Sequence, residues 1–256
     1  MIKDPNSIVE KLVADVRTVF GDHLLSVVLY GSAVTHEFVP GKSDVNITLV
    51  ADALPQDLLD TGAAVLRGWM RRGVAVPLFL TPADLAVLPE YYPVEFLAIQ
   101  RTHRILWGED CFSGIPISRT GLRRQCRREL AGMVVQLRKD YLRYGGRPSE
   151  LSGVLEQTVQ AVLPMFMAIV LLHDRTVPSA KTELIAAVED LFGLGASVLS
   201  EVYNRSGPVT AEKCVAEFNR LVGVIDMIAN RMNATPAETE IPVCSGEESP
   251  FVPVDR

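Results

Sequence analysis

The chain has 256 residues, of which 48% are hydrophobic and 22% charged, and its formal net charge is −6. This composition is typical of a globular protein with one large domain or two modest ones. The acidic balance argues against a binder of duplex nucleic acid, because such proteins usually carry a basic excess.

Neither a secretory leader nor a membrane span is expected. The first residues are mixed in charge and lack an apolar core, which argues against a signal peptide. The most apolar run, 161–172, is shorter than the roughly 20 residues that cross a bilayer, so a buried bundle helix is expected there. The four cysteines form no CxxC pair, which argues against a local zinc site and favours free thiols in a cytoplasmic protein.

The first half of the chain alternates between predicted helices and strands. Ser7 and Glu10 form a capping-box pattern, which predicts a helix that begins at Ser7 and ends at Gly21. Compact apolar runs predict strands at 24–30, 44–50 and 74–80. Further elements are expected in the intervening and following segments: a helix at 56–72, a capped turn or short helix at 81–88, a helical segment at 93–100 and a short strand at 105–107.

From Arg119 onward the apolar residues recur every three to four positions, which predicts helices only. A long amphipathic helix is expected first, followed by four more at 151–173, 181–192, 196–203 and 210–232. The predicted fold class is therefore α+β: a small mixed sheet domain at 1–115, then a helical bundle at 119–232. Residues 233–256 are acidic and proline-rich, which predicts an extended or disordered tail.

One stretch, 25–50, has a pattern that suggests specific chemistry. A predicted strand runs into Gly31 and Ser32, and Asp44, Val45 and Asn46 follow on the next predicted strand. Gly31 lets backbone N–H groups approach a phosphate, Ser32 adds a hydroxyl, and a helix start at this point favours anions. Strand alternation puts Asp44 and Asn46 on one face. A carboxylate there could hold Mg²⁺ against nucleotide phosphates.

This pattern resembles the DNA polymerase beta-like nucleotidyltransferase superfamily. The family motif is an apolar strand, Gly-Ser or Gly-Gly, a spacer, and Asp-x-Asp or Asp-x-Glu between apolar residues; the match covers 27–50 and extends loosely through 1–115. A catalytic half followed by a helical bundle is similar to bacterial aminoglycoside adenylyltransferases. The resemblance implies that Gly31 and Ser32 hold a nucleoside triphosphate, ATP. It implies that Asp44 is catalytic and binds Mg²⁺ with Asn46 as an auxiliary ligand, and that AMP passes to a small-molecule acceptor.

The sequence also departs from the family pattern. Asn46 stands where the family has a second acid, and the strand at 74–80, where a third carboxylate is often found, contains no acid. Asp84, Glu90 and Glu95 are the nearest alternatives in sequence. Two hypotheses follow: a nucleotidyltransferase with impaired transfer, or a catalytically inactive protein that keeps the fold for nucleotide binding, regulation or interaction.

The predicted helix after Arg119 is strongly basic. Residues 119–147 contain nine arginines and lysines but only Glu129 and Asp140 as acids. A solvated helix face, paired with the acidic tail, would explain this charge. Alternatively, some members, with Arg123 and Arg127 as candidates, could face nucleotide phosphates or an anionic partner. His36, between the two halves of the motif, could also approach a substrate.

Overall fold

The computed structural model describes residues 2–35, 37–41, 43–145, 147–195 and 197–232. These residues form two compact units: 2–89 with 96–117, and 90–95 with 118–232. The first unit contains a small mixed sheet with helices and the second contains helices, so the predicted α+β class is confirmed. The predicted tail, 233–256, lies outside the described residues.

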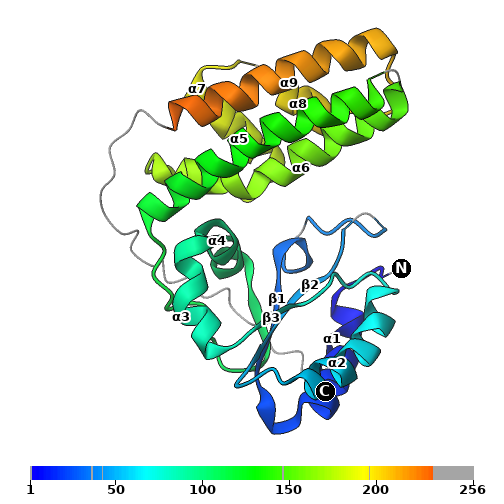
Figure 1. Cartoon of the computed structure of the whole chain (residues 1–256), viewed down its shortest axis with the longest axis vertical. Coiled ribbons are helices and arrows are strands. Elements are labelled where there is room, and N and C mark those ends of the chain that lie inside the picture. The colour runs from blue at the N-terminus through cyan, green and yellow to red at the C-terminus, as the bar shows by residue number, and fades with distance from the viewer. Residues whose placement is uncertain (1, 36, 42, 146, 196, 233–256) are drawn as a thin grey trace, which may run out of the picture. The chain divides into compact units, whose positions relative to one another are not determined.

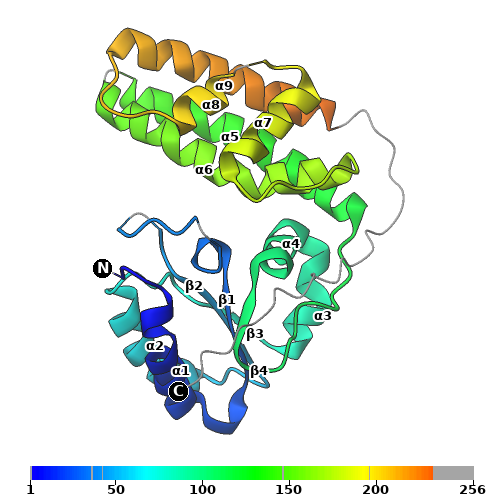
Figure 2. The ribbon, with the colours of Figure 1, turned by 180° about the vertical axis from the view of Figure 1, so that it is seen from behind.

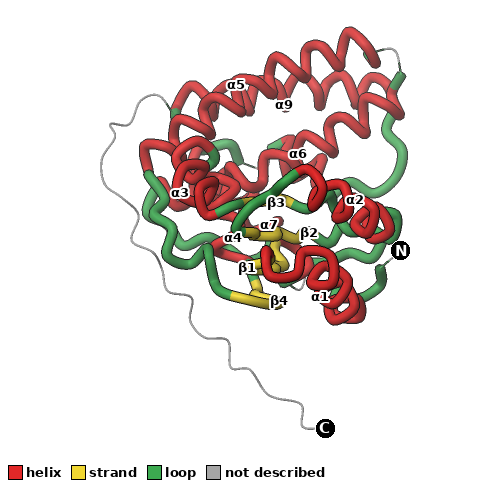
Figure 3. Tube along the Cα trace, turned by 60° about the horizontal axis from the view of Figure 1, so that its bottom comes forward, coloured by secondary structure: helices red, strands yellow, loops and turns green. Residues whose placement is uncertain are grey.

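The sheet of the first unit has four strands within the described residues, in the order β3-β2-β1-β4 (Figures 1 and 3). Strand β1 pairs antiparallel with both β2 and β4, whereas β2 and β3 are parallel. The last strand was predicted at 105–107 and is one residue longer at each end. The strand bounds are β1 Leu24–Tyr30, β2 Asn46–Ala51, β3 Leu78–Leu80 and β4 Arg104–Gly108.

Helices α1 (Asn6–Phe20) and α2 (Gln56–Met70) cover one face of this sheet (Figure 1). Their buried side chains form one core with the inward-facing strand residues. That core includes Leu12, Val16, Phe20, Leu66 and Trp69 from the helices and Val27, Leu29, Val45, Ile47 and Leu49 from the sheet. Alternation along β2 directs Asn46 and Thr48 to the opposite face. On that side lie α3 (Pro82–Tyr91) and the part of α4 (Pro93–Thr102) that belongs to this unit (Figures 1 and 2).

The predicted capping box at the first helix is wrong. Helix α1 begins at Asn6, and the Ser7 hydroxyl donates to the carbonyl of Asp4 at 2.6 Å instead of accepting from the helix. The Asp4 carboxylate accepts the N–H of Asn6 at 2.9 Å, so an acid upstream of the predicted cap satisfies the first turn. The predicted end at Gly21 is confirmed.

Two predicted strands are shorter than expected. Strand β2 begins at Asn46, and Val45 makes only an isolated bridge to Val74. Strand β3 is confined to Leu78–Leu80, because Pro77 has no N–H to donate to a ladder. The partner of Val45 is Val74 but the partner of Thr48 is Leu78, so the pairing shifts by one residue across this interruption.

The second unit contains the five predicted helices, with ends within three residues of the predicted ones. They are α5 Arg119–Tyr144, α6 Pro148–Leu172, α7 Lys181–Phe192, α8 Val198–Tyr203 and α9 Ala211–Arg231. Side chains of Ser118, Ser197 and Thr210 cap α5, α8 and α9, as expected for these residue types at an N-cap. By length and composition α6 could cross a membrane, but it packs against the other four helices.

Two buried carboxylates tie the end of the bundle together. Glu189 accepts hydrogen bonds from the backbone and hydroxyl of Ser197 and from Ser200, which fixes α8 against α7. Glu217 of α9 accepts from Arg205, and both side chains are nearly inaccessible, with 3% and 7% of their areas exposed. Arg205 also donates to the Ser152 hydroxyl at 2.6 Å. A longer ion pair, 3.6 Å, connects Arg205 to Glu156 of α6. Arg205 therefore joins α6, α9 and the loop after α8.

Candidate functional site

Gly31 ends β1 and lies against Asn46. Its φ is +73°, a conformation that glycine adopts readily and other residues do not. Tyr30 is the register partner of Asn46 across the β1–β2 ladder, and a Cβ atom added to Gly31 would lie 3.2 Å from Nδ2 of Asn46. The two halves of the sequence motif are therefore in contact in the folded chain.

Ser32 directly follows Gly31, and Asp44 lies two residues before Asn46. Ser32 is half-buried in the short 3₁₀ turn Gly31–Ala33 that follows β1, and Asp44 is exposed, just outside β2. Within the described ranges, neither side chain has a hydrogen-bond or ion-pair partner. Two residues beyond Asn46 the Thr48 hydroxyl is fully buried, also with no described partner. Of the polar residues predicted on one face, Asn46 and Thr48 alternate on β2, whereas Asp44, the only one that carries charge, lies before the strand.

The N–H of Gly31 already has a partner, which the sequence did not indicate. It donates to Oγ1 of Thr102 at 3.1 Å, and the Thr102 hydroxyl donates in turn to the carbonyl of Ala98 at 2.9 Å. Thr102 is the last residue of α4 and lies 71 positions from Gly31 in sequence. No local pattern could have predicted this contact, because it depends on where the end of α4 lies against β1.

The strand neighbouring β2 presents apolar side chains where the family pattern has a third acid. Leu78 is the register partner of Thr48, and Val76 and Leu78 are 77% and 36% exposed. Among the described residues, no group of three or more His, Cys, Asp or Glu side chains is placed to hold a metal ion. Asp44 and Asn46 together offer one carboxylate and one amide oxygen. They fit a single Mg²⁺ carried by a triphosphate, but they do not fit a pair of protein-held ions.

Two of the three alternative acids have hydrogen-bond partners of their own. Asp84 accepts the N–H of Thr81 at 2.8 Å and donates its own N–H to the Thr81 hydroxyl, which is a capping box at the start of α3. Glu95 belongs to the second unit and accepts from Gln125 at 2.6 Å. Glu90 also belongs to that unit.

The remaining candidates belong to the second unit or lie outside the described residues. Arg123 and Arg127 are residues of α5 in the second unit. His36 lies outside the described residues. The structure therefore adds Thr102 to the predicted site residues of the first unit, Gly31, Ser32, Asp44 and Asn46.

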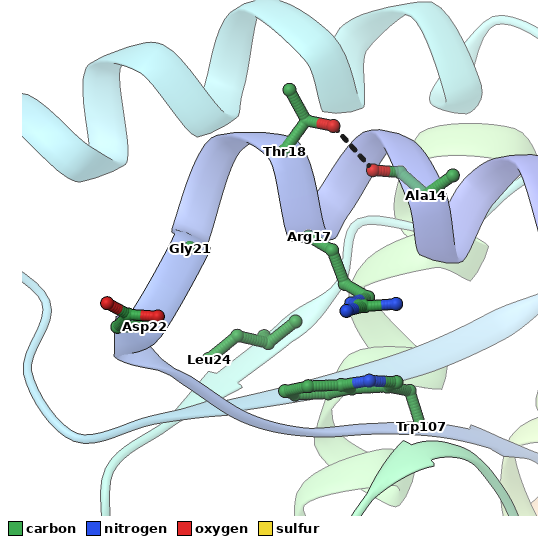
Figure 4. A pocket seen from close by; sticks show the side chains of 7 residues that line it. All are labelled: Ala14, Arg17, Thr18, Gly21, Asp22, Leu24 and Trp107. Carbon is green, nitrogen blue, oxygen red and sulfur yellow. Dashed lines mark hydrogen bonds between the residues drawn. The ribbon is translucent and has the colours of Figure 1, made fainter.

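A separate pocket lies at the other end of β1. It has a volume of about 580 Å³ and is lined by Ala14, Arg17, Thr18, Gly21, Asp22, Leu24 and Trp107 (Figure 4). The Arg17 guanidinium lies above the Trp107 indole, 5.1 Å from the ring centroid. Leu24 begins β1 whereas Gly31 follows its last residue, so this pocket and the Gly31–Asn46 contact are roughly 20 Å apart along the strand.

Gly31→Ala is expected to destabilise the first unit by about 1–2 kcal/mol, because the added Cβ is strained at positive φ. The same Cβ would press on the Asn46 amide. Gly68→Ala is the matched control, since Gly68 lies in α2 with no atom within 4 Å of an added Cβ, and it should be neutral or stabilising. Thermal denaturation followed by tryptophan fluorescence measures both variants, since Trp69 and Trp107 lie in the first unit. If Gly31→Ala and Gly68→Ala changed the melting temperature equally, the strain argument would be contradicted.

Comparison with known proteins identifies the class of fold. No protein-family model and no curated protein sequence matches the chain. Among solved structures, the crystal structure of spectinomycin adenyltransferase AAD(9) from Enterococcus faecialis with ATP and spectinomycin is similar, with a TM-score of 0.55. The alignment covers 86% of this chain and 99% of that chain at 12% sequence identity. At this identity the likeness shows the fold alone.

Proposed function

We propose that the chain binds ATP at Gly31, Ser32 and Asp44, and that it transfers AMP to a small-molecule acceptor slowly. The observation that carries this proposal is the contact between Gly31 and Asn46 beside the Asp44 carboxylate, which has no partner among the described residues. The fold adds support, because the similar solved structure was determined with ATP and spectinomycin.

Each residue has a role that follows from its chemistry. Gly31 leaves room for a phosphate at the end of β1, and Ser32 offers a hydroxyl donor. Asp44 and the amide oxygen of Asn46 would hold one Mg²⁺ that arrives with the triphosphate, and such an ion neutralises phosphate charge. In the transfer, an acceptor oxygen or nitrogen bonds to the α-phosphorus, the bond from that phosphorus to the bridging oxygen breaks, pyrophosphate leaves, and the acceptor's proton passes to water. Transfer is slow because only one of the family's carboxylates is present.

A second candidate is a non-catalytic protein that keeps the fold for nucleotide binding, regulation or interaction. Two observations favour it. The Gly31 N–H is occupied by Thr102, and Val76 and Leu78 are exposed beside β2 at the expected position of the third acid. Both features reduce the capacity of the site for charged phosphates and metal ions.

Incubation with ATP labelled on the α-phosphate, over a panel of small hydroxylated and amine acceptors, separates the two candidates. The proposal predicts slow, Mg²⁺-dependent labelling of an acceptor that Asp44→Asn abolishes. Asp22→Asn is the matched control, because Asp22 is an exposed acid of the same unit at the other end of β1. Nucleotide binding without labelled product would favour the second candidate.

Thr102→Val is expected to tighten ATP binding about two- to tenfold, because the Gly31 N–H then becomes free to donate to a phosphate, and one net hydrogen bond contributes roughly 0.5–1.5 kcal/mol. The Thr102→Ser variant retains the hydroxyl and should bind like the natural chain. Titration calorimetry measures the affinities. If Thr102→Val folds but binds ATP no better than Thr102→Ser, the Gly31 N–H takes no part in phosphate binding.

A further inference from the structure

The outer face of α5 is basic along most of its length. Its inner face is defined by the buried residues Leu122, Cys126, Leu130, Val134 and Leu137. The exposed face carries six cations, which recur at helical spacing and which we call the basic stripe: Arg124, Arg127, Arg128, Arg138, Lys139 and Arg143. The two acids of this helix, Glu129 and Asp140, are half-buried and accept from Gln125 and Gln136.

Little of the described chain neutralises the basic stripe. Arg128 reaches Glu129 at 3.3 Å and Arg124 reaches the carbonyl of Glu90 at 3.4 Å, both of which are long contacts. Arg127, Arg138 and Lys139 have no hydrogen-bond or ion-pair partner among the described residues. Like charges three and four positions apart destabilise a helix by roughly 0.2–0.5 kcal/mol per pair. An anionic occupant would therefore stabilise α5 as well as bind to it.

The same face also exposes apolar side chains. Val135 is 51% exposed and Leu142 is 87% exposed, and both lie one or two turns from stripe cations on the outer side of the helix. The small residues Ala131 and Gly132 lie between the two ends of the stripe. An occupant that complements this face must therefore combine acidic with apolar side chains, which a simple polyanion does not.

The segment that ends the sequence has this combination. Residues 233–256 contain five acidic residues and a single arginine: Glu238, Glu240, Glu247, Glu248, Asp255 and Arg256. Apolar residues are interspersed with these acids: Ile241, Val243, Phe251, Val252 and Val254. The charge and the apolar content of the segment thus match the basic stripe.

The end of α9, from which this segment continues, lies close to the basic stripe. Helices α5 and α9 are antiparallel neighbours (Figures 1 and 2), and Phe218 of α9 stacks on Tyr141 of α5 with ring centroids 4.7 Å apart. From Phe218 to its end at Arg231, α9 advances about 20 Å back along α5. The segment 233–256 therefore leaves α9 beside the first half of α5, where Arg127 and Arg128 lie.

We propose that the basic stripe is the docking surface of the chain's own acidic segment, 233–256. The stripe is about 28 Å long by helical rise, and 24 residues can extend to roughly 80 Å, so the segment can span it. Attachment to α9 makes the contact intramolecular at an effective concentration of the order of millimolar. Weak charge pairs, together with the burial of Val135 and Leu142, are then sufficient for docking.

Zero-length carbodiimide coupling of the full chain tests the contact, because Lys139 is the one lysine of the stripe. Mass spectrometry of dilute protein at low salt should show amide links from Lys139 to Glu238, Glu240, Glu247 or Glu248, and these links should fall at least fivefold in about 1 M salt, where screening is strong. Lys213 is the internal control, since it lies 4.0 Å from Glu217 one helical turn away. The proposal is overturned if Lys139 forms no links to the tail, or if its links to the tail are no more frequent than those of the other lysines.

Binding to heparin, used as a polyanion probe, provides the second measurement. Changing the four tail glutamates to glutamine in the full chain should tighten heparin binding at least tenfold, and adding Arg127→Glu with Arg138→Glu should remove that gain. Arg71→Glu with Arg101→Glu, exposed arginines of the first unit, is the matched control and should leave the gain intact. If the natural chain binds heparin as tightly as the neutral-tail variant, the tail does not occupy the stripe.

Discussion

Replacing Asn46 with aspartate is expected to tighten Mg²⁺-dependent ATP binding about tenfold, which corresponds to roughly 1.4 kcal/mol. The new carboxylate would lie beside Gly31, two residues from Asp44, and would supply the second charged oxygen ligand that Mg²⁺ prefers. AMP transfer should rise by a similar factor or more, because charge on the transferring group is better neutralised. Calorimetric titration with ATP, with and without Mg²⁺, measures the first effect.

The matched control for this variant is Asn6→Asp. Asn6 belongs to α1, which covers the sheet face opposite Asn46, and its side-chain oxygen accepts from Arg104 at 2.7 Å. Aspartate therefore keeps the contact and adds the same charge on that other face. It should leave ATP binding unchanged. Without Mg²⁺, Asn46→Asp should lower the melting temperature because two carboxylates then repel each other, and Mg²⁺ with ATP should restore it. If Asn46→Asp gave no metal-dependent gain in ATP affinity, more than one residue would limit the site.

Removing the carboxylate of Glu217 is expected to cost about 3 kcal/mol in the second unit, because Arg205 would lose its buried counter-charge and keep only a longer contact, 3.6 Å, to the exposed carboxylate of Glu156. The Glu217→Ala variant should show this loss in denaturant unfolding followed by far-ultraviolet circular dichroism. Hydrogen exchange should locate it in the loop after α8 and in α9. These two segments contain the paired residues.

The control is an exposed ion pair between α8 and α9. Arg220 donates two hydrogen bonds to Glu201 at 2.7 and 2.8 Å, but both side chains are close to half exposed. Glu201→Ala should therefore cost less than about 1 kcal/mol. A double replacement, Arg205→Met with Glu217→Leu, should recover much of the lost stability, since apolar residues of similar volume often replace a buried pair without loss. Equal costs for the two single variants would contradict the role assigned to burial.

Local patterns were enough to predict most elements. The period of apolar residues indicated all five helices of the bundle, and the Gly31–Ser32 and Asp44–Asn46 spacing indicated that the two segments meet. Pro77 was a signal in the sequence that the strand at 74–80 is interrupted, because a proline has no N–H to donate to a β-ladder. The start of the first helix was misjudged because Asp4, which precedes the predicted cap, competes for the same turn.

The contacts that depend on tertiary packing could not be predicted in this way. Thr102 meets Gly31 only because α4 ends beside β1, and Arg205 meets Glu217 only because a loop folds against α6 and α9. In both cases the residue types are common and their spacing carries no periodic signal. Side-chain contacts across such distances follow from the assembled fold and not from the sequence around either residue.

Calorimetric titration of the natural chain with ATP in the presence of Mg²⁺ tests the proposed function most directly, with Asp44→Asn as the paired variant. The proposal predicts saturable binding to the natural chain that is weakened at least tenfold by Asp44→Asn, since removal of the single charged ligand removes the metal contact. No binding to either the natural chain or Asn46→Asp, with both chains folded, would contradict a nucleotide site at Gly31–Asn46.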